Sequence, residues 1–394
     1  MSEAAVVIIG SGLAGYNVAR ELRKLDAQVP IVVISRDQAG FYSKPMLSNA
    51  LAGKKTAATL VMKAADKMAS EIQAQVLPHS IVSQIDTQAQ TVTLTGGQVI
   101  TYRDLVLATG ADPIRIPLEG DAVKQVLSVN DLEDFALFAE ALDTAAGGQP
   151  ARKVAILGAG LIGCEFANDL LARSIEPTVI DLSDRVLNRL LPPVASARLQ
   201  SSLEQAGARF RFGVGLQRVD RRADGPGLTL TLSDGSTLEA DLVLSAIGLR
   251  PRAALATVAG IQVNRGIVVN RQLATSAPHI YAVGDCAEVD GLNLPYVLPL
   301  MTQARALAAT LTGKPTDVVY PAMPVVVKTP AQPTVICPPP AGAAGDWQVN
   351  ETDDALEARF TSPADPAQLL GFVLQGKAVS QRQAWAAQAP ALLS

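Results

Sequence analysis

The chain has 394 residues, of which 48% are hydrophobic and 18% charged, enough for two or three ordinary globular domains. Its net charge of −4 and the lack of a basic tract argue against bulk nucleic-acid binding. With two histidines and three cysteines far apart, we expect no protein-ligated metal and no disulfide framework. The sequence has no bilayer-spanning apolar stretch and no recognisable signal peptide, so we expect no membrane insertion and a reducing cytoplasm.

The first segment with a clear pattern, Val6–Gly15, joins a strand, a glycine-rich turn and a helix start. Four apolar residues, Val6–Ile9, predict a buried parallel strand, and the glycines leave no Cβ in the way of a phosphate. Free N–H groups at the helix start favour an anion. This is the G-x-G-x-x-G dinucleotide fingerprint, although a lone match can also reflect close packing. Its N-terminal position favours FAD. The candidate contacts are Gly10, Ser11, Gly12, Leu13, Ala14 and Gly15.

The strand after the first helix, Ile31–Ile34, ends where an acidic residue is expected to hold ribose hydroxyls. The chain has Ser35, Arg36 and Asp37 there instead. Three interpretations stay open. Ser35 takes the hydroxyls while Arg36 stacks on adenine, or Asp37 reaches back, or the segment is an ordinary polar strand end.

The segment Phe41–Ser48 lies where flavin disulfide reductases carry a redox-active cysteine pair, but here it offers only Ser43 and Ser48. That absence argues against thiol–disulfide chemistry. It also argues against peroxidases that cycle one cysteine through sulfenic acid, because they need a reactive thiolate. Lys44 is the candidate functional residue of the segment, and the alternative is a solvated loop lysine.

Two similar strands mark the expected passages between domains. Val82 belongs to a strand pair that could lie along adenine, and the buried strand Leu105–Leu107 leads to Thr109 and Gly110. A near-copy, Leu242–Gly248, occurs later in the chain. We interpret the two strands as the crossings out of and into the FAD-binding domain.

A second fingerprint, Val154–Gly163, repeats the strand, the glycine spacing and the helix start. Two copies in one chain argue against coincidence and predict two nucleotides whose reactive rings meet. The following strand ends in Asp181, whose carboxylate suits ribose hydroxyls and would repel a 2′-phosphate by about 4 kcal/mol at about 4 Å and an effective dielectric of about 20. We therefore expect NADH over NADPH, with Arg185 as a residue that could instead serve a phosphate. The candidate contacts at the turn are Gly158, Gly160, Leu161, Ile162 and Gly163.

A third strand leads into Gly284 and Asp285, where a carboxylate suits ribityl hydroxyls and the alternative is a turn cap. We expect a helix after a loop at 294–301. The proline-rich end from Tyr320, with Lys328 at a strand end, predicts a small separate domain. The expected fold class is α/β, with two Rossmann-like dinucleotide-binding domains (FAD and NAD) plus a small C-terminal α+β domain. The expected boundaries are 1–112 and 242–319 for the FAD domain, 113–241 for the NAD domain, and 320–394 for the C-terminal domain.

These motifs resemble the FAD-dependent pyridine nucleotide reductases that supply electrons to small iron proteins. Tyr42–Leu47, Gly163–Asp169, Asn264–Val269 and Val327–Pro330 are most similar to the rubredoxin-reducing branch and its flavorubredoxin-reducing relatives. Ferredoxin reductases of dioxygenase systems carry a tryptophan-rich segment where this chain has Leu294–Pro299. The resemblance implies tightly bound FAD, NADH as electron donor and rubredoxin, a small acidic iron protein, as acceptor.

The resemblance also implies residue roles. We hypothesise that Lys44 and Glu165 pair beside the flavin as catalytic residues, and that Lys44, Arg305 and Lys328 form a basic docking patch. The implied FAD contacts are Gly10 to Gly15, Ser35, Arg36, Lys44, Val82, Glu165, Asp285, Val297 and Lys328. The implied NADH contacts are Gly158 to Gly163 and Asp181.

Several functional alternatives stay open at this point. The acceptor could be a flavorubredoxin or a ferredoxin, or oxygen in an NADH oxidase. A non-enzyme alternative is an NAD-bound flavoprotein acting as a redox sensor. Alkane degradation, nitric oxide removal and oxygen defence would use nearly the same reductase. A monomer fits a protein that must expose its flavin edge.

Overall fold

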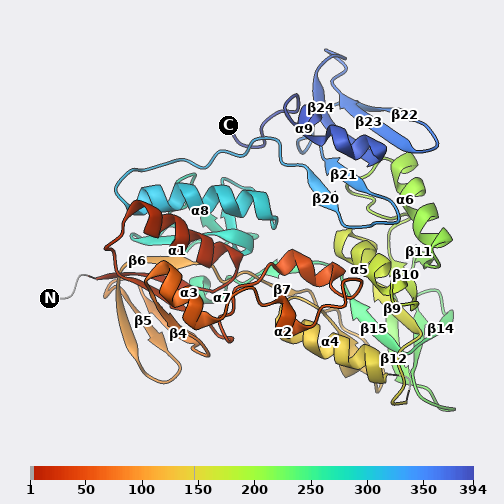
Figure 1. The fold of residues 1–394 in the computed structure, drawn as a ribbon, viewed down its shortest axis with the longest axis horizontal. Helices are drawn as coiled ribbons and strands as arrows, with labels where there is room; N and C mark the ends of the chain where they lie inside the picture. The colour runs from red at the N-terminus through yellow and green to blue at the C-terminus, as the bar shows by residue number, and fades with distance from the viewer. Residues whose placement is uncertain (1–3, 146) are drawn as a thin grey trace.

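The computed structural model describes residues 4–145 and 147–394, which form two α/β domains side by side and a smaller domain beside the second (Figure 1). Each of the two larger domains is built on a parallel sheet, and the third on an antiparallel one. The predicted fold class is therefore confirmed. Within the described residues, no helix is long and apolar enough to cross a membrane.

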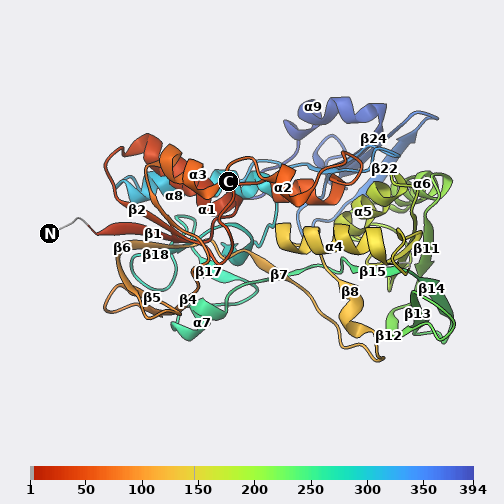
Figure 2. The same cartoon turned by 60° about the horizontal axis from the view of Figure 1, so that its bottom comes forward.

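The first domain has a parallel sheet in the order β3-β2-β1-β6, with β18 on the other side of β6. Helices α1 and α8 cover one face of it and the β4–β5 hairpin the other (Figure 2), so Val6–Ile8 are fully buried and apolar throughout. The strands are β1 (Ala5–Ile9), β2 (Ile31–Ile34), β3 (Gln75–Leu77), β4 (Val82–Asp86), β5 (Thr91–Leu94), β6 (Val99–Leu107), β17 (Ile267–Val269), β18 (Ile280–Ala282) and β19 (Ala287–Val289). The helices are α1 (Leu13–Leu25), η1 (Lys44–Asn49), α2 (Ala57–Leu60), α3 (Ala65–Ile72), α7 (Ala254–Val258), η3 (Gly284–Cys286) and α8 (Val297–Leu311).

Helix α8 begins at Val297, inside the stretch 294–301 that we expected to be a loop. Pro299 falls in its first turn, where the missing N–H has no helical partner to lose. The expectation of a loop was therefore wrong, because proline is compatible with a helix start.

The second domain repeats the arrangement, with a parallel sheet in the order β11-β10-β9-β15-β8 and an antiparallel sheet β12-β13-β14. Phe135, Phe138 and Phe166 are fully buried between its helices and the sheet. The strands are β8 (Val126–Leu127), β9 (Lys153–Leu157), β10 (Glu176–Asp181), β11 (Arg209–Phe212), β12 (Leu216–Arg221), β13 (Leu228–Leu232), β14 (Thr237–Ala240) and β15 (Leu242–Ser245). The helices are η2 (Val123–Gln125), α4 (Leu132–Thr144), α5 (Leu161–Leu171) and α6 (Pro193–Gln205).

The chain returns to the first domain later than predicted. Strand β15, Leu242–Ser245, pairs with β9 inside the second sheet, so the boundary placed before residue 242 was wrong. The passages are made instead by β7 (Ala111–Pro113) and β16 (Leu249–Pro251), which pair antiparallel. Strand β7 lies between the two domains in Figure 2. The similarity of β6 and β15 reflects equal places in two similar sheets, because each strand is buried beside the strand that precedes a glycine turn.

The C-terminal domain is an antiparallel sheet in the order β20-β21-β24-β23-β22. Side chains alternate across β24, so Val373 packs on the second domain while Phe372 and Leu374 pack beneath Trp385 of α9. The small α+β domain expected from Tyr320 onward is therefore present. Its elements are β20 (Val325–Val327), β21 (Thr334–Cys337), β22 (Asp346–Glu351), β23 (Ala355–Thr361), β24 (Leu369–Gly376), η4 (Lys377–Gln381) and α9 (Arg382–Ala386).

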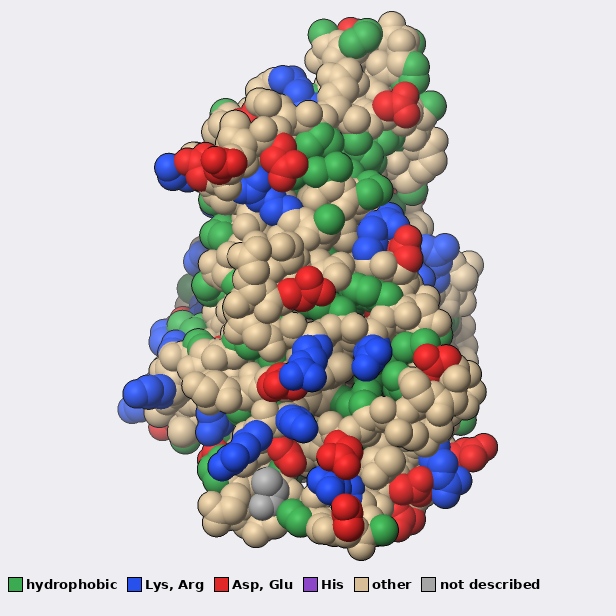
Figure 3. Space-filling view, turned by 90° about the vertical axis from the view of Figure 1, so that its right-hand side faces the viewer, with side chains coloured by type: hydrophobic (Ala, Val, Ile, Leu, Met, Phe, Trp, Pro, Cys, Tyr) green, Lys and Arg blue, Asp and Glu red, His purple; other side chains and the backbone are tan. Residues whose placement is uncertain are grey.

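Polar contacts join the C-terminal domain to helix α6 of the second domain. Arg198 donates to the carbonyl oxygens of Thr352 and Asp353, each at 2.7 Å. The buried Gln375 side chain donates to the Ala195 carbonyl at 2.9 Å. On the outer face of these two domains, cationic and anionic side chains lie intermixed (Figure 3), so this face shows no single-sign charge field.

Candidate functional site

The candidate site is a cleft of about 2150 Å³ that both glycine turns line. A typical pocket for one small ligand measures roughly 300–1,000 Å³, so this cleft has room for two dinucleotides. Lys328 of the C-terminal domain reaches the same cleft. Most of the cofactor residues predicted from the sequence line it. They are Gly10, Ser11, Gly12, Leu13, Ala14, Ser35, Arg36, Lys44, Val82, Thr109, Gly110, Gly158, Gly160, Leu161, Ile162, Glu165, Asp181, Asp285, Val297 and Lys328.

Three predicted glycines serve packing and do not line the cleft. A Cβ on Gly15 or on Gly163 would lie 1.9 Å from the carbonyl oxygen of the first glycine of its own turn. A Cβ on Gly284 would lie 2.7 Å from Ala14. These residues let helices approach strands and turns closely, so predicting them as cofactor contacts was wrong in this respect.

The first glycine turn fits a pyrophosphate. Gly10 has φ +118° and a Cβ there would lie 2.1 Å from the Ala108 carbonyl oxygen, which fixes the tight turn. A Cβ added to Gly12, by contrast, would have no described heavy atom within 4 Å. Gly12 is the N-cap residue of α1, and no side chain among the described residues caps this helix. The first N–H groups of the helix therefore remain for a ligand.

An acidic residue, Asp37, follows the end of β2, where we expected a carboxylate for the ribose hydroxyls. The Asp37 side chain accepts a hydrogen bond from the Ser35 hydroxyl at 2.6 Å and from the Ala39 N–H at 2.8 Å. The Ser35 and Ser11 hydroxyl oxygens are also 2.6 Å apart. Asp37 therefore reaches back toward the glycine turn through Ser35, which was one of the three interpretations open from the sequence.

The second turn is built in the same way, with the acid at the predicted position. Asp181 accepts from the Ala159 N–H at 2.6 Å and from the N–H and hydroxyl of Ser183 at 2.7 and 2.6 Å. The carboxylate thus fixes the second glycine turn, and its contact with ribose hydroxyls stays a prediction. Arg185 pairs with Asp184 at 2.8 Å and lies outside the cleft lining, so it is turned away from the site.

The predicted pairing of Lys44 with Glu165 is wrong. Glu165, only 2% exposed, forms its ion pair with Lys328 and also accepts from the Ser48 hydroxyl at 2.5 Å. Lys44 lies 3.5 Å from Asp285. The partner of Glu165 comes from the C-terminal domain, 163 residues away, because a buried carboxylate needs a countercharge and β20 ends beside α5.

The predicted basic docking patch is wrong for the same reason. Lys44 and Lys328 are both paired with carboxylates inside the cleft, with side chains only 33% and 27% exposed. Of the three predicted residues, Arg305 is exposed. Arg382 of α9 is also exposed and lines the cleft, which the sequence did not indicate.

Sequence reasoning also missed Asp169 on α5. It is 1% exposed and accepts hydrogen bonds from the N–H groups of Leu51 and Ala52 at 2.9 and 2.8 Å. Burial raises the pKa of this carboxyl, and the two N–H donors oppose the rise. The available signal was a second acid four residues after Glu165 on a helix whose other residues, apart from Asn168, are apolar or glycine.

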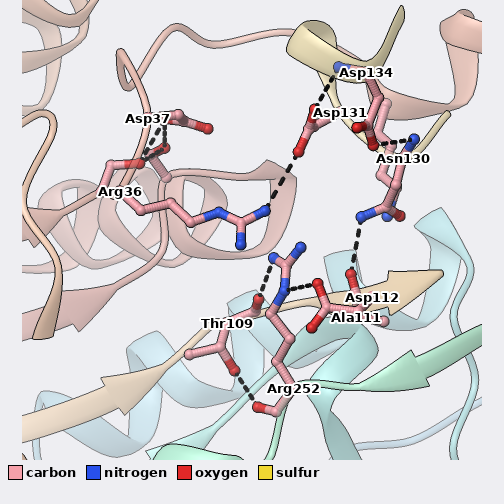
Figure 4. A network of polar contacts seen from close by, with 12 residues as sticks. Arg36, Asp37, Thr109, Ala111, Asp112, Asn130, Asp131, Asp134 and Arg252 are labelled. Atoms are coloured by element: carbon pink, nitrogen blue, oxygen red, sulfur yellow. Dashed lines mark hydrogen bonds and ion pairs between the residues drawn. The ribbon is translucent and has the colours of Figure 1, made fainter. Parts of the chain in front are cut away.

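The junction between the domains is held by polar contacts (Figure 4). The Thr109 hydroxyl donates to the Arg252 carbonyl at 2.8 Å, and the Arg252 guanidinium pairs with Asp112 at 2.5 Å. Arg36, 3.3 Å from Asp131 at the start of α4, links the end of β2 to the second domain. Arg36 therefore has a protein partner besides any cofactor.

The cysteines are unsuited to redox chemistry. Burial raises the pKa of the Cys164 thiol to about 12 and that of Cys337 to about 11. Cys286 is fully buried and its pKa is raised for the same reason. Across residues 4–145 and 147–394, no group of His, Cys, Asp and Glu side chains could hold a metal ion.

Comparisons with known proteins separate the C-terminal domain from the rest of the chain. The profile described as pyridine nucleotide-disulphide oxidoreductase matches residues 4–308, and that described as rubredoxin binding C-terminal domain matches residues 317–389. The chain is 46% identical to Rubredoxin-NAD(+) reductase of Alcanivorax borkumensis, over 98% of this chain and 99% of the relative. It is 40% identical to Nitric oxide reductase FlRd-NAD(+) reductase of Aeromonas salmonicida, over 96% of each. Among solved structures, putidaredoxin reductase in a covalent complex with putidaredoxin is 28% identical, with a TM-score of 0.86 and coverage of 99% and 94%.

Proposed function

The chain belongs to the pyridine nucleotide-disulphide oxidoreductase family, and from that premise we propose that it is an FAD-containing reductase that carries electrons from NADH to a rubredoxin. The observation that carries the proposal is the ion pair between Glu165 and Lys328. It brings the domain whose profile is described as rubredoxin-binding into the cleft that both glycine turns line. A partner bound to that domain would lie close to the site of flavin reduction.

The chain's own residues have distinct tasks in this reaction. Gly10–Gly12 and the start of α1 would present N–H groups to the pyrophosphate of FAD, and Asp37 with Ser35 would offer acceptors to its ribose. The second turn and Asp181 would hold NADH in the same way. When bound, FAD supplies the ability to accept a hydride and to release electrons one at a time. Orientation by the two turns converts an encounter of two reactants into a transfer within one complex.

Two lysines bring positive charge into the cleft. Lys44 stands on η1 beside Asp285, and Lys328 at the end of β20 beside Glu165. Because each charge is balanced by a carboxylate, the pairs add directed hydrogen-bond donors without a large net charge. We assign Lys44 and Lys328 to orienting the flavin, and Glu165 to holding Lys328 in place.

Docking of the acceptor then depends on the rim of the cleft. Leu298 and Val326 are 52% and 45% exposed and line the cleft, as does the exposed Arg382. Apolar side chains exposed at a binding site favour contact with a partner, and one cation among them suits an acidic protein. We expect the charge to act chiefly on the association rate, which should fall as salt is added.

The test is reduction of purified rubredoxin by NADH, followed as loss of its visible iron–thiolate absorbance. A ferredoxin and an oxygen-only reaction serve as controls. Fast, saturable reduction of rubredoxin alone supports the proposal. Equal or faster reduction of the ferredoxin would overturn the choice of acceptor, and transfer to oxygen alone would favour an NADH oxidase.

A flavorubredoxin is the second candidate acceptor, favoured by the 40% identity to the Aeromonas salmonicida relative. Comparing kcat/KM for rubredoxin and flavorubredoxin separates the two. Among the three pathways left open by the sequence we propose alkane degradation first, because the identity to Rubredoxin-NAD(+) reductase of Alcanivorax borkumensis, 46%, exceeds the 40% identity to the nitric oxide reductase relative of Aeromonas salmonicida. Three free, buried cysteines are consistent with the proposed cytoplasmic location.

A further inference from the structure

Helix α5 presents three polar side chains to segments of the other two domains. Glu165 accepts from the Ser48 hydroxyl on η1 and from the Lys328 N–H of the C-terminal domain, at 2.5 and 2.9 Å. Asn168 accepts from the Ala331 N–H at 3.0 Å. Asp169 is directed to the chain that follows η1. Helix α5, which begins at the second glycine turn, therefore contacts both the C-terminal domain and residues 44–52, which we call the flavin-side segment.

The contact made by Asp169 is a charge-assisted bridge to two consecutive amides. Each carboxylate oxygen takes one N–H, from Leu51 at 2.9 Å and from Ala52 at 2.8 Å. At 1% exposure, water does not compete for the carboxylate. Charge-assisted bonds of this kind are about twice as strong as neutral ones and fix direction as well as distance.

Glu165 and Asp169 are one helical turn apart, about 6 Å along the axis at about 1.5 Å per residue. Glu165 holds residue 48 and Asp169 holds residues 51 and 52, so two points of the flavin-side segment are attached to one rigid element. Lys44 begins this segment and lines the cleft. Its place relative to the second glycine turn therefore depends on α5.

We propose that Asp169 is a positioning residue for hydride transfer, which sets the spacing between the flavin-side segment 44–52 and the second glycine turn. The proposal rests on the proposed NADH-to-FAD chemistry but not on the identity of the acceptor. The second glycine turn leads into α5 through its N-cap, Gly160, and the flavin-side segment is attached to the same helix further along, at Glu165 and Asp169. Orientation errors near 1 Å can slow such transfers by roughly a hundredfold, so a modest loosening should be measurable.

The test compares the wild type with Asp169→Asn. The amide keeps the size of the side chain but places an NH2 group against one of the two backbone N–H donors. The first readout is amide hydrogen exchange of the peptide that contains Leu51 and Ala52, which should become faster. The second is stopped-flow reduction of the bound flavin by NADH, which should slow roughly tenfold or more. The KM for NADH should change much less, because Asp169 does not line the cleft.

Asp241→Asn is the matched control. One oxygen of Asp241 accepts the N–H groups of Arg152 and Lys153 at 2.7 and 2.9 Å, at the start of β9 and so at the end of the strand away from the glycine turn. This variant should speed exchange around 152–153 and leave flavin reduction unchanged. A loss caused by general loosening of the second domain would appear in both variants.

Unchanged flavin reduction in Asp169→Asn, with or without faster exchange at residues 51 and 52, would overturn the proposal. So would an equal loss of reduction in Asp241→Asn. If Asp169→Asn yields no folded protein, Asp169→Ser, smaller and still polar, is measured in the same way. If NADH does not reduce the flavin of the wild-type protein, the proposed function is refuted instead. If NADH reduces the flavin but the flavin does not reduce rubredoxin, only the choice of acceptor is refuted.

Discussion

The ion pair between Glu165 and Lys328 allows a quantitative prediction. Lys328→Met removes the ammonium group but keeps a long, unbranched side chain, so the packing at the end of β20 changes little. Glu165, with a side chain 3% exposed, then keeps, among the described residues, the Ser48 hydroxyl and the backbone N–H of residue 328 as its donors. Its negative charge is left buried without a countercharge.

Removing one partner of a buried ion pair costs about 3–5 kcal/mol, because the remaining charge is uncompensated. The Lys328 side chain is 27% exposed, so water can solvate part of the site and we expect the lower end, about 3 kcal/mol. Glu165→Gln should cost only about 1 kcal/mol, because the freed ammonium can reach water while the Gln oxygen still accepts. The double variant should be more stable than Lys328→Met alone, since no buried charge remains.

The free energy of unfolding of the four proteins is measured by urea denaturation, from midpoint shifts at constant slope. The dissociation constant for FAD is measured for each protein, and the stabilisation by bound FAD, RT ln(1 + [FAD]/Kd), is subtracted, so that a change in cofactor affinity is separated from loss of the ion pair. The reasoning is refuted if Lys328→Met costs no more than Glu165→Gln, or if the double variant is less stable than Lys328→Met.

Three further predictions concern the turns and the thiols. Gly10→Ala should prevent folding, because its Cβ would lie 2.1 Å from the Ala108 carbonyl oxygen. Gly12→Ala, whose Cβ meets no described atom, should fold but bind FAD more weakly, which titration followed by flavin fluorescence measures. Normal FAD affinity in Gly12→Ala would contradict this. Asp181→Ala should lower the kcat/KM preference for NADH over NADPH by up to about a thousandfold, from about 4 kcal/mol of lost repulsion, and an unchanged ratio would count against it. With a pKa of about 12 at Cys164 and all three cysteines buried, Ellman's reagent at pH 8 should label none in the native protein and three after denaturation, and rapid native labelling would contradict this.

The glycine turns and the parallel strands were predictable from the sequence because their physics is local. Gly10 and Gly158 adopt positive φ next to a carbonyl oxygen, and that requirement appears in the sequence as the glycine itself. Asp181 was predicted at its strand end because the distance from turn to acid is set within one β-α-β unit. The role of Asp37 stayed open, because its effect passes through the Ser35 side chain.

Errors arose where a residue's neighbours come from another domain. The strand Leu242–Ser245 was assigned to the wrong sheet because its apolar sequence suits either one, and only its pairing with β9 distinguishes them. The Lys44–Glu165 pair was wrong because two lysines and several acids, among them Glu165 and Asp285, line one cleft, and side-chain geometry selects the partners.

The sequence by itself therefore determined two dinucleotide-binding units, the lack of a redox cysteine pair at Phe41–Ser48 and a separate C-terminal domain. All three follow from residue types at short spacing. The tertiary structure alone decided that α5 connects the three domains, through Glu165 to Lys328 and through Asp169 to Leu51 and Ala52. These contacts span 117 to 163 residues, and they form because a buried carboxylate must find donors among whatever the packing of the domains brings beside it.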